Sequence, residues 1–330
     1  MSGATGDALA LTGAALAALL ASVVLVRSLE RLAGRLRLTE ALLGMVVALA
    51  ADTPEITSAI TAFARGQSTV GNGVVLGSNV FNLAALLGLS GIVAARIALH
   101  RRVVLLEGVP ACWIAAVAVA VVVGGLPPGI GLIAVALVVV PYLAVAASTS
   151  VRASLPAPAA GWVREAVREE EAELALAIHP RRGQRADAAV AAASLLVVVA
   201  ASVVMEHAAV GLGTRAGLSE LVVGGVVLAA LTSLPNAVGA VYLATRARGP
   251  AVLSEAMNSN MLNVVVGLLI PGVVLGVARA TSADALVAWW YVGLTALCVA
   301  VSYAGRGIRR ATGAVIVACY AAFVVAAVRW

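Results

Sequence analysis

Residues 52–55 (Asp-Thr-Pro-Glu) and 77–82 (Gly-Ser-Asn-Val-Phe-Asn) form a polar signature inside apolar sequence, and the chain contains this signature twice. The second copy is residues 232–236 (Thr-Ser-Leu-Pro-Asn) followed by residues 258–263 (Asn-Ser-Asn-Met-Leu-Asn). In each copy the proline precedes the serine of the second segment by 24 positions. Polar groups are costly in hydrocarbon, so a doubled polar signature predicts an ion site at the interface of two repeats.

The composition indicates an integral membrane protein. Hydrophobic residues make up 62% of the 330 residues, charged residues only 12%, and the mean hydropathy is +1.05. The net charge of +6 comes from arginines in short loops beside apolar segments, which indicates membrane topology and not a nucleic-acid surface. The three cysteines are isolated in apolar runs, without the spacing of a metal site.

Apolar stretches of about 20 residues predict membrane-spanning helices. The first is not expected to be a cleavable signal, because Asp7 precedes it and the arginines follow it. We therefore predict an all-α integral membrane fold of ten transmembrane helices. They lie near residues 8–26, 39–64, 71–95, 103–124, 129–149, 187–211, 219–245, 252–278, 283–304 and 309–328.

The loop arginines predict how these spans are oriented. Alternate loops carry 18 arginines, and the opposite set carries only Arg65, Arg215, Arg279 and Arg329. The positive-inside rule then puts both termini outside the cell membrane and the connector in the cytoplasm. The two copies of the signature are consequently inverted relative to each other.

This orientation predicts a 5+5 inverted-topology repeat in three parts. Residues 1–149 form the first five-helix half, with its repeat motif at 39–95. Residues 150–186 form a cytoplasmic connector with a surface helix. Residues 187–330 form the second half, with its repeat motif at 219–278.

Each signature contains a proline that breaks its helix. Pro54 and Pro235 have no N–H, so the carbonyls of Ala50 and Leu231 lose their helical partners, and predicted helices 2 and 7 become discontinuous. Non-helical backbone at membrane depth is tolerated where it lines a cavity or binds an ion. Carbonyl, hydroxyl, amide and carboxylate oxygens are hard donors that suit Na⁺ or Ca²⁺.

The first copy carries two carboxylates near the middle of its span. Asp52 and Glu55 are three residues apart and share a helix face. Each would cost about 2.5–3.5 kcal/mol at the bilayer centre if unpaired, so a proton or a bound cation is the expected partner. Ser78 and Asn82 lie one turn apart, as do Ser259 and Asn263; singly, such residues serve equally well as interhelical packing contacts.

These segments resemble the two α-repeats of the cation/Ca²⁺ antiporter superfamily, the family of the sodium/calcium exchanger membrane domain. Its repeats read Gly-Thr-Ser-x-Pro-Glu followed by Gly-Ser-Asn-x-x-Asn/Asp. The resemblance implies ion binding by side chains of both repeats, together with the backbone carbonyls of Ala48 and Ala229. Including the residues that depart from the pattern, the predicted ion-binding side chains are Asp52, Glu55, Ser78, Asn82, Thr232, Ser233, Asn236, Ser259 and Asn263.

The departures from the family pattern concern charge. Asn236 stands where the second repeat has its acid, Asn263 where many exchangers carry Asp, and Asp52 where the first repeat has a hydroxyl residue. Two carboxylates in one span could neutralise one Ca²⁺, or bind one Na⁺ and one proton. Glu255, one turn before Ser259, reads equally as an acid of a cytoplasmic vestibule or as an ordinary interfacial glutamate.

The resemblance implies a secondary antiporter, not an enzyme, that exchanges Ca²⁺ for Na⁺ or H⁺ by alternating access. Spans 1 and 6 would slide over the other eight, and we expect them to carry no charge inside the membrane. The alternatives are a monovalent cation/proton exchanger, a transport-inactive family member, and an intramembrane protease using Asp52 and Glu55. No cofactor is expected; the expected partners are the lipid bilayer and the transported cations, with no nucleic acid and no inferable protein partner.

Overall fold

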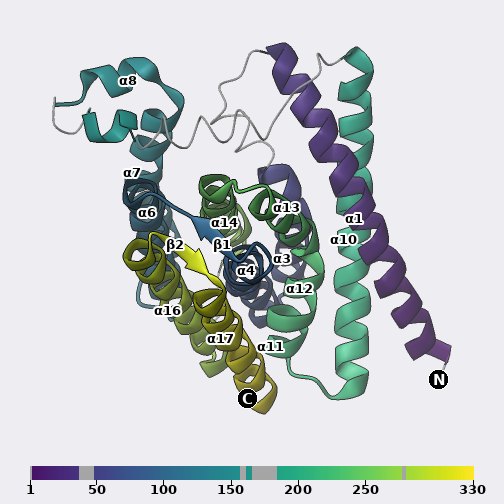
Figure 1. Cartoon of the computed structure of the whole chain (residues 1–330). Coiled ribbons are helices and arrows are strands. Elements are labelled where there is room, and N and C mark those ends of the chain that lie inside the picture. The colour runs from purple at the N-terminus through teal and green to yellow at the C-terminus, as the bar shows by residue number, and fades with distance from the viewer. Residues whose placement is uncertain (1, 37–47, 157–160, 166–183, 277–279) are drawn as a thin grey trace.

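The computed structural model describes residues 2–36, 48–156, 161–165, 184–276 and 280–330, and these are almost entirely helical (Figure 1). The elements of the first half are α1 (Ser2–Leu36), α3 (Thr53–Ala64), α4 (Ser68–Asn82), the π-helix η1 (Leu83–Leu89), α5 (Ser90–Val93), β1 (Arg96–Ala98), α6 (Arg101–Val122), α7 (Pro128–Ala147) and α8 (Thr149–Ser154). The elements of the second half are α10 (Arg185–Ala216), α11 (Glu220–Val222), η2 (Val223–Leu228), α12 (Ala229–Thr232), α13 (Leu234–Thr245), α14 (Gly249–Leu262), η3 (Asn263–Leu269), α15 (Ile270–Leu275), α16 (Ser282–Gly305), β2 (Gly307–Arg309) and α17 (Arg310–Arg329).

The apolar helices are long enough to cross a bilayer. Over the described residues eight helices pass this test, and the bent pair of Glu220–Thr232 with Leu234–Thr245 makes a ninth. The predicted span at 39–64 includes residues 39–47, which lie outside the described ranges. Of the predicted connector helix, residues 161–165 are helical and residues 166–183 lie outside the described part.

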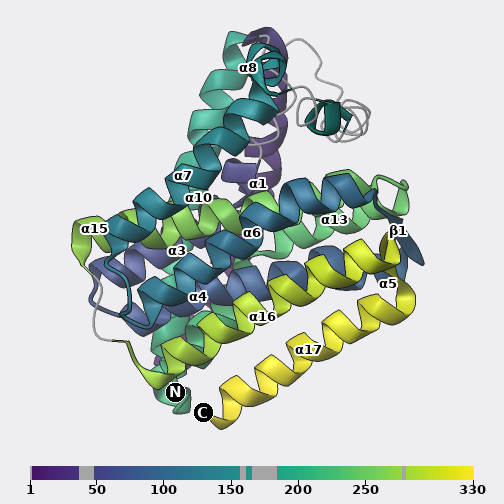
Figure 2. The ribbon, with the colours of Figure 1, turned by 90° about the vertical axis from the view of Figure 1, so that its left-hand side faces the viewer.

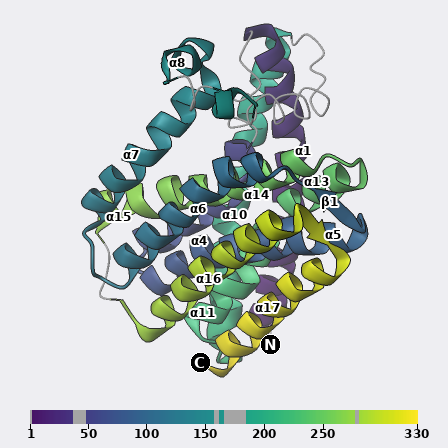
Figure 3. The ribbon, with the colours of Figure 1, turned by 60° about the vertical axis from the view of Figure 1, so that its left-hand side comes forward.

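Two sets of neighbouring helices lie on different sides of the molecule. Figure 1 shows α1 and α10 side by side along one edge, and α10 packs against α3. On another face α7, α6, α16 and α17 form a row of neighbours (Figures 2 and 3). Leu20, Leu137 and Leu196 on α1, α7 and α10 are 67%, 71% and 70% exposed, as expected for residues that face lipid instead of water.

The two halves meet at glycines in the centre of the molecule. A Cβ atom on Gly73 would lie 2.8 Å from the backbone nitrogen of Gly225, and one on Gly77 would lie 2.6 Å from the Gly225 Cα. Only glycine permits backbones to approach this closely, which is how small residues act in membrane helix packing. The contact places α4 of the first half directly against η2 of the second.

The structure adds two short strands that the all-helical prediction lacks. β1 and β2 pair antiparallel, with buried Ile97 opposite Ile308. Gly307 has φ +124°, a conformation that L side chains rarely adopt, and it lies directly against the Ile97 carbonyl. The strands join the α5–α6 connection of the first half to the α16–α17 connection of the second.

The two polar signatures occupy equivalent places in the fold. The first lies where a helical stretch ending at Ala51 meets α3 at a turn on Asp52, and the second where α12 meets α13 at Ser233 with a 48° bend. After each signature a helix passes into a seven-residue π-helix, η1 or η3, in which the ring of backbone hydrogen bonds is wider. Polar side chains from the segments beside these breaks and π-helices contact one another.

Candidate ion-binding site

The nine predicted side chains, here called the cluster, are all buried, and hydrogen bonds that run through Asn79 and Asn260 connect all of them except Ser78 and Thr232. They come from the start of α3, the end of α4, the α12–α13 break and the region where α14 meets η3. Each is at most 2% exposed: Asp52, Glu55, Ser78, Asn82, Thr232, Ser233, Asn236, Ser259 and Asn263. Because the apolar helices surround them, their polar atoms must be satisfied by one another or by a ligand.

Asp52 joins the first half to the second through one carboxylate oxygen. Its Oδ1 accepts hydrogen bonds from Ser259 Oγ at 2.6 Å and from Asn236 Nδ2 at 2.7 Å. Its Oδ2 is buried and has no hydrogen-bond partner among the described residues. Asn236, which stands where the family pattern has an acid, is therefore an amide donor to the acid of the other repeat.

Glu55 makes the equivalent crossing one turn further along α3. Its Oε1 accepts a hydrogen bond from Ser233 Oγ, and its Oε2 accepts one from Asn263 Nδ2 at 2.6 Å. Both donors belong to the second half. Because both carboxyl oxygens are held by donors, these contacts fix the position of the Glu55 side chain.

A pair of asparagines that the sequence prediction did not include holds the two halves together. Asn79 Nδ2 donates to the Asn260 carbonyl at 3.1 Å, and Asn260 Nδ2 donates to the Asn79 carbonyl at 3.2 Å. The two residues are the third positions of Gly-Ser-Asn and Asn-Ser-Asn, so their matching places in the repeats were the signal that could have identified them. In this reciprocal contact α4 and α14, the matching helices of the two repeats, each donate one hydrogen bond to the other.

The cluster has an excess of buried oxygens over donors. Five of its atoms have no hydrogen-bond partner among the residues that the structure describes: Asp52 Oδ2, Ser78 Oγ, Asn82 Oδ1, Asn236 Oδ1 and Asn263 Oδ1. Asn82 Nδ2, in contrast, donates to Ser259 Oγ at 3.1 Å, and the Asn236 and Asn263 nitrogens bind the two carboxylates. With the amide N–H groups engaged elsewhere, carboxylate and amide oxygens are left for a hard cation.

The two predicted backbone carbonyls and the Thr232 hydroxyl already make hydrogen bonds to the backbone. The Ala48 carbonyl accepts from the backbone nitrogen of Asp52 at 2.9 Å, and the Ala229 carbonyl accepts from that of Ser233 at 3.2 Å. Thr232 Oγ1 donates to carbonyls of its own helix. Each of these oxygens retains a lone pair, so these bonds leave all three able to contact a cation.

Comparison with known proteins identifies the family. A family model described as sodium/calcium exchanger protein matches residues 7–151 and 187–329. The chain belongs to the sodium/calcium exchanger protein family. It is accordingly a multi-pass membrane transporter and not an enzyme, which confirms the sequence prediction. Comparison with curated protein sequences gave no match.

Solved structures share the fold of this exchanger-family chain at low identity. The sodium-calcium exchanger NCX_Mj, soaked with zero Na⁺ and Ca²⁺, is 18% identical with a TM-score of 0.60, and the match covers 96% of this chain and 99% of that one. YfkE is 16% identical with a TM-score of 0.65, covering 99% and 98%. The H⁺/Ca²⁺ exchanger CAX is 12% identical with a TM-score of 0.66, covering 98% and 86%.

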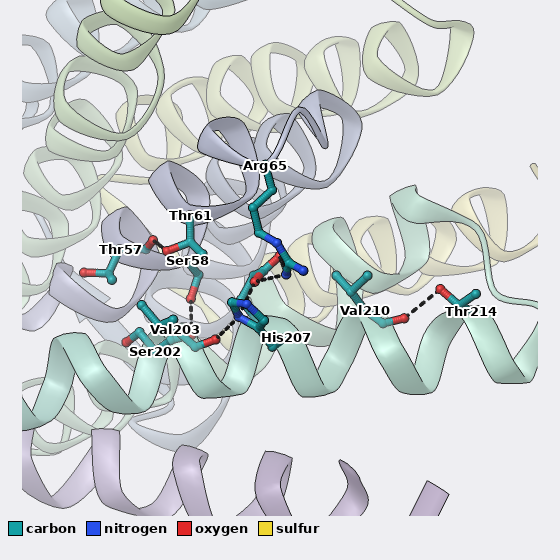
Figure 4. Close-up of polar contacts among 10 residues, drawn as sticks. Thr57, Ser58, Thr61, Arg65, Ser202, Val203, His207, Val210 and Thr214 are labelled. Carbon is teal, nitrogen blue, oxygen red and sulfur yellow. Dashed lines mark hydrogen bonds and ion pairs between the residues drawn. The ribbon is translucent and has the colours of Figure 1, made fainter. Parts of the chain in front are cut away.

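This exchanger-family protein also buries an acid in the helix that corresponds to predicted span 6. Glu206 of α10 is fully buried, and its Oε2 lies 3.1 Å from Arg65 Nη1 and 3.0 Å from His207 Nδ1. Nearby, Ser58 Oγ donates to the Ser202 carbonyl at 3.5 Å (Figure 4). The expectation that span 6 carries no charge inside the membrane is therefore wrong. The Glu206 charge is balanced by Arg65, which caps the end of α3 and follows the last residue of the predicted span 39–64.

Three further buried acids lie away from the cluster. Asp187, at the start of α10, lies 3.3 Å from Arg31 Nη1. Glu107 of α6 accepts a hydrogen bond from Tyr142 Oη at 2.8 Å. Asp284 of α16 accepts one from Asn72 Nδ2 at 2.9 Å and also caps its own helix through Thr281. Asp284 therefore has a structural role, while Glu107 is a polar contact between α6 and α7.

Proposed function

We propose that this chain is a secondary antiporter that moves Ca²⁺ in exchange for Na⁺ or H⁺, by alternating access to the buried cluster. The observation that carries the proposal is the set of buried oxygens without donors beside Asp52 and Glu55. Ca²⁺ prefers six to eight oxygen ligands of this kind, from carboxylates, amides and carbonyls. The relatives NCX_Mj and CAX, named as sodium-calcium and H⁺/Ca²⁺ exchangers, support this class of substrate.

The charge of the cluster supports a divalent ion. Asp52 and Glu55 together carry two negative charges when ionised, which one Ca²⁺ neutralises. Each carboxylate also receives neutral donors from the second half, so a cation would bind to a framework that is already oriented. We propose all nine clustered side chains as the ion-binding set, with the Ala48 and Ala229 carbonyls as backbone ligands.

We further propose the topology in which this site operates. The chain would have ten spans in a 5+5 inverted repeat, with spans 2 and 7 discontinuous at Asp52 and Ser233. The halves would be residues 1–149 and 187–330, joined by a cytoplasmic connector at 150–186, with both termini outside. α1 and α10 would slide as a pair over the remaining helices, since they pack mainly on each other.

A monovalent cation/proton exchanger is the second candidate. Asn236 and Asn263 favour it, because amides stand at positions where the family pattern has acids. A site with fewer charges stabilises fewer cations at once. A transport-inactive family member is the remaining alternative.

Reconstitution in vesicles tests these proposals. Ca²⁺ flux is followed under an imposed Na⁺ gradient and then under a pH gradient, for the wild type, Glu55→Gln, and Glu220→Gln as an exposed control. We expect gradient-driven flux that is lost in Glu55→Gln and retained in Glu220→Gln. Flux that ignores both gradients refutes antiport, and normal flux in Glu55→Gln refutes the site. Na⁺/H⁺ exchange without Ca²⁺ flux would favour the monovalent candidate.

A further inference from the structure

A third carboxylate lies beside the cluster, on the helix that carries Ser259. Glu255 of α14 precedes Ser259 by four residues and Asn263 by eight, so the three share a helix face. Its Oε2 atom is buried and has no hydrogen-bond partner among the described residues. The side chain therefore has the same unsatisfied oxygen chemistry as the proposed site.

The contacts between α13 and α14 locate this carboxylate. Asn236 Nδ2 on α13 lies 3.3 Å from Ser259 Oγ on α14. Three residues further along α13, a Cβ on Gly239 would lie 3.1 Å from Glu255 Oε1. The helices are antiparallel neighbours, so Glu255 lies one helical turn, about 5 Å, beyond Asn236, towards the turn that holds Arg246 and Arg248.

Gly239 leaves the room that the carboxylate occupies. A side chain there would press on Glu255 Oε1, because 3.1 Å is tighter than ordinary van der Waals contact. Asp52 reaches the same pair of helices, because its Oδ1 accepts hydrogen bonds from Asn236 on α13 and Ser259 on α14, and its buried Oδ2 also has no partner among the described residues. Two carboxylates in one buried site require a proton or a bound cation to compensate their charge, and the unpartnered oxygens of Glu255 and Asp52 are suited to a hard cation.

We propose that Glu255 is a cation ligand that supplies, from α14, the second-half negative charge that Asn236 does not supply from α13. With Asp52 it would form a Na⁺ position one turn from the Ca²⁺ ligands. This inference rests on the proposed function. It changes the charge of the site from two carboxylates in one half to three, contributed by both halves, so Ca²⁺ and one Na⁺ could be neutralised together.

A charge-relocation experiment tests the inference in reconstituted protein. The concentration of Na⁺ that half-maximally drives Ca²⁺ flux is measured for the wild type, Glu255→Gln, Glu255→Asp and Glu220→Gln. We expect Glu255→Gln to raise it about 10-fold or more, from the loss of one buried charge, and the other two variants to stay within about 3-fold of the wild type. Thermal unfolding in detergent shows whether each variant remains folded.

The decisive comparison moves the charge by one turn. Asn236→Glu combined with Glu255→Gln is expected to recover most of the Na⁺ response, whereas Asn236→Gln combined with Glu255→Gln is not. Gly239→Ala keeps the charge of Glu255 but places a methyl group against its carboxylate, so it should weaken the Na⁺ response. This variant replaces Glu255→Gln as the test if Glu255→Gln does not fold. A normal Na⁺ response in Glu255→Gln, or equal behaviour of the two double variants, overturns the inference. Absence of Ca²⁺ flux in the wild type would instead overturn the proposed function.

Discussion

Replacing Gly77 with alanine tests whether the two halves meet through their backbones. The added Cβ would lie 2.6 Å from the Gly225 Cα, and its other nearest atoms also belong to the Gly225 backbone. No flexible side chain can move aside, so α4 and η2 must separate. Reaching an ordinary contact distance of 3.4 Å from this Cα requires a shift of at least about 0.8 Å, and the Gly225 carbonyl oxygen, which would lie closer still, requires more.

The cost of this shift has two parts. Overpacking of a well-packed interior costs about 1–3 kcal/mol, which we expect to lower the midpoint of thermal unfolding by several degrees. The shift also moves Ser78, the next residue, and Asn82, one turn further, away from the second-half ligands. We therefore expect Ca²⁺ affinity to fall by more than the loss of stability alone predicts.

Thermal unfolding in detergent, with and without Ca²⁺, separates the two parts. The matched control is Gly293→Ala in α16, because a Cβ there would meet nothing within 4 Å. Gly293→Ala should unfold at or slightly above the wild-type temperature, since alanine is the better helix former. If Gly77→Ala unfolds and binds Ca²⁺ as Gly293→Ala does, the glycine contact between the halves is refuted.

Three further variants test contacts outside the proposed site by thermal unfolding or proteolysis. Arg65→Ala leaves Glu206 without its arginine and should lower the free energy of unfolding by about 2 kcal/mol. This is less than the cost of breaking a fully buried pair, because the Arg65 side chain is 41% exposed. Adding Glu206→Gln should recover part of the lost stability, and a double variant as unstable as Arg65→Ala alone would contradict the pairing. Tyr142→Phe removes a donor to Glu107 and should lower stability by about 1–2 kcal/mol, and no change would show that the bond contributes nothing. Gly307→Ala should separate β1 from β2, seen as faster tryptic cleavage at the neighbouring arginines; wild-type cleavage rates would contradict it.

The sequence predicted most of the elements that form the cluster because the relevant signals are local. A proline such as Pro54 removes a hydrogen bond at a known position, and hydropathy marks each span by length. The equal spacing of the two signatures also indicated that they form one site. Which side chains would donate to which carboxylate depends on how the helices pack, and no local signal carries that information.

The remaining contacts show why the rest required the structure. Asn79 and Asn260 bind each other's backbone, a geometry that hydropathy and periodicity do not encode. Glu206 pairs with Arg65, which is 141 positions away in the other half, and no local pattern in the sequence indicates that pairing. β1 and β2 are three residues each, below the length at which alternation of polar and apolar residues is informative.

The crossing of hydrogen bonds between the halves has a consequence for biosynthesis. Asp52 and Asn236 are 184 positions apart, and Glu55 and Asn263 are 208 apart. At a synthesis rate of about 5–20 residues per second, roughly 10–40 s separate the two partners during translation. For that interval the first carboxylates enter the membrane without the amides that will hold them. Nascent chains arrested before residue 263 therefore present a buried carboxylate, Glu55, without its Asn263 donor, so the acidic span is completed only when the second half has been made.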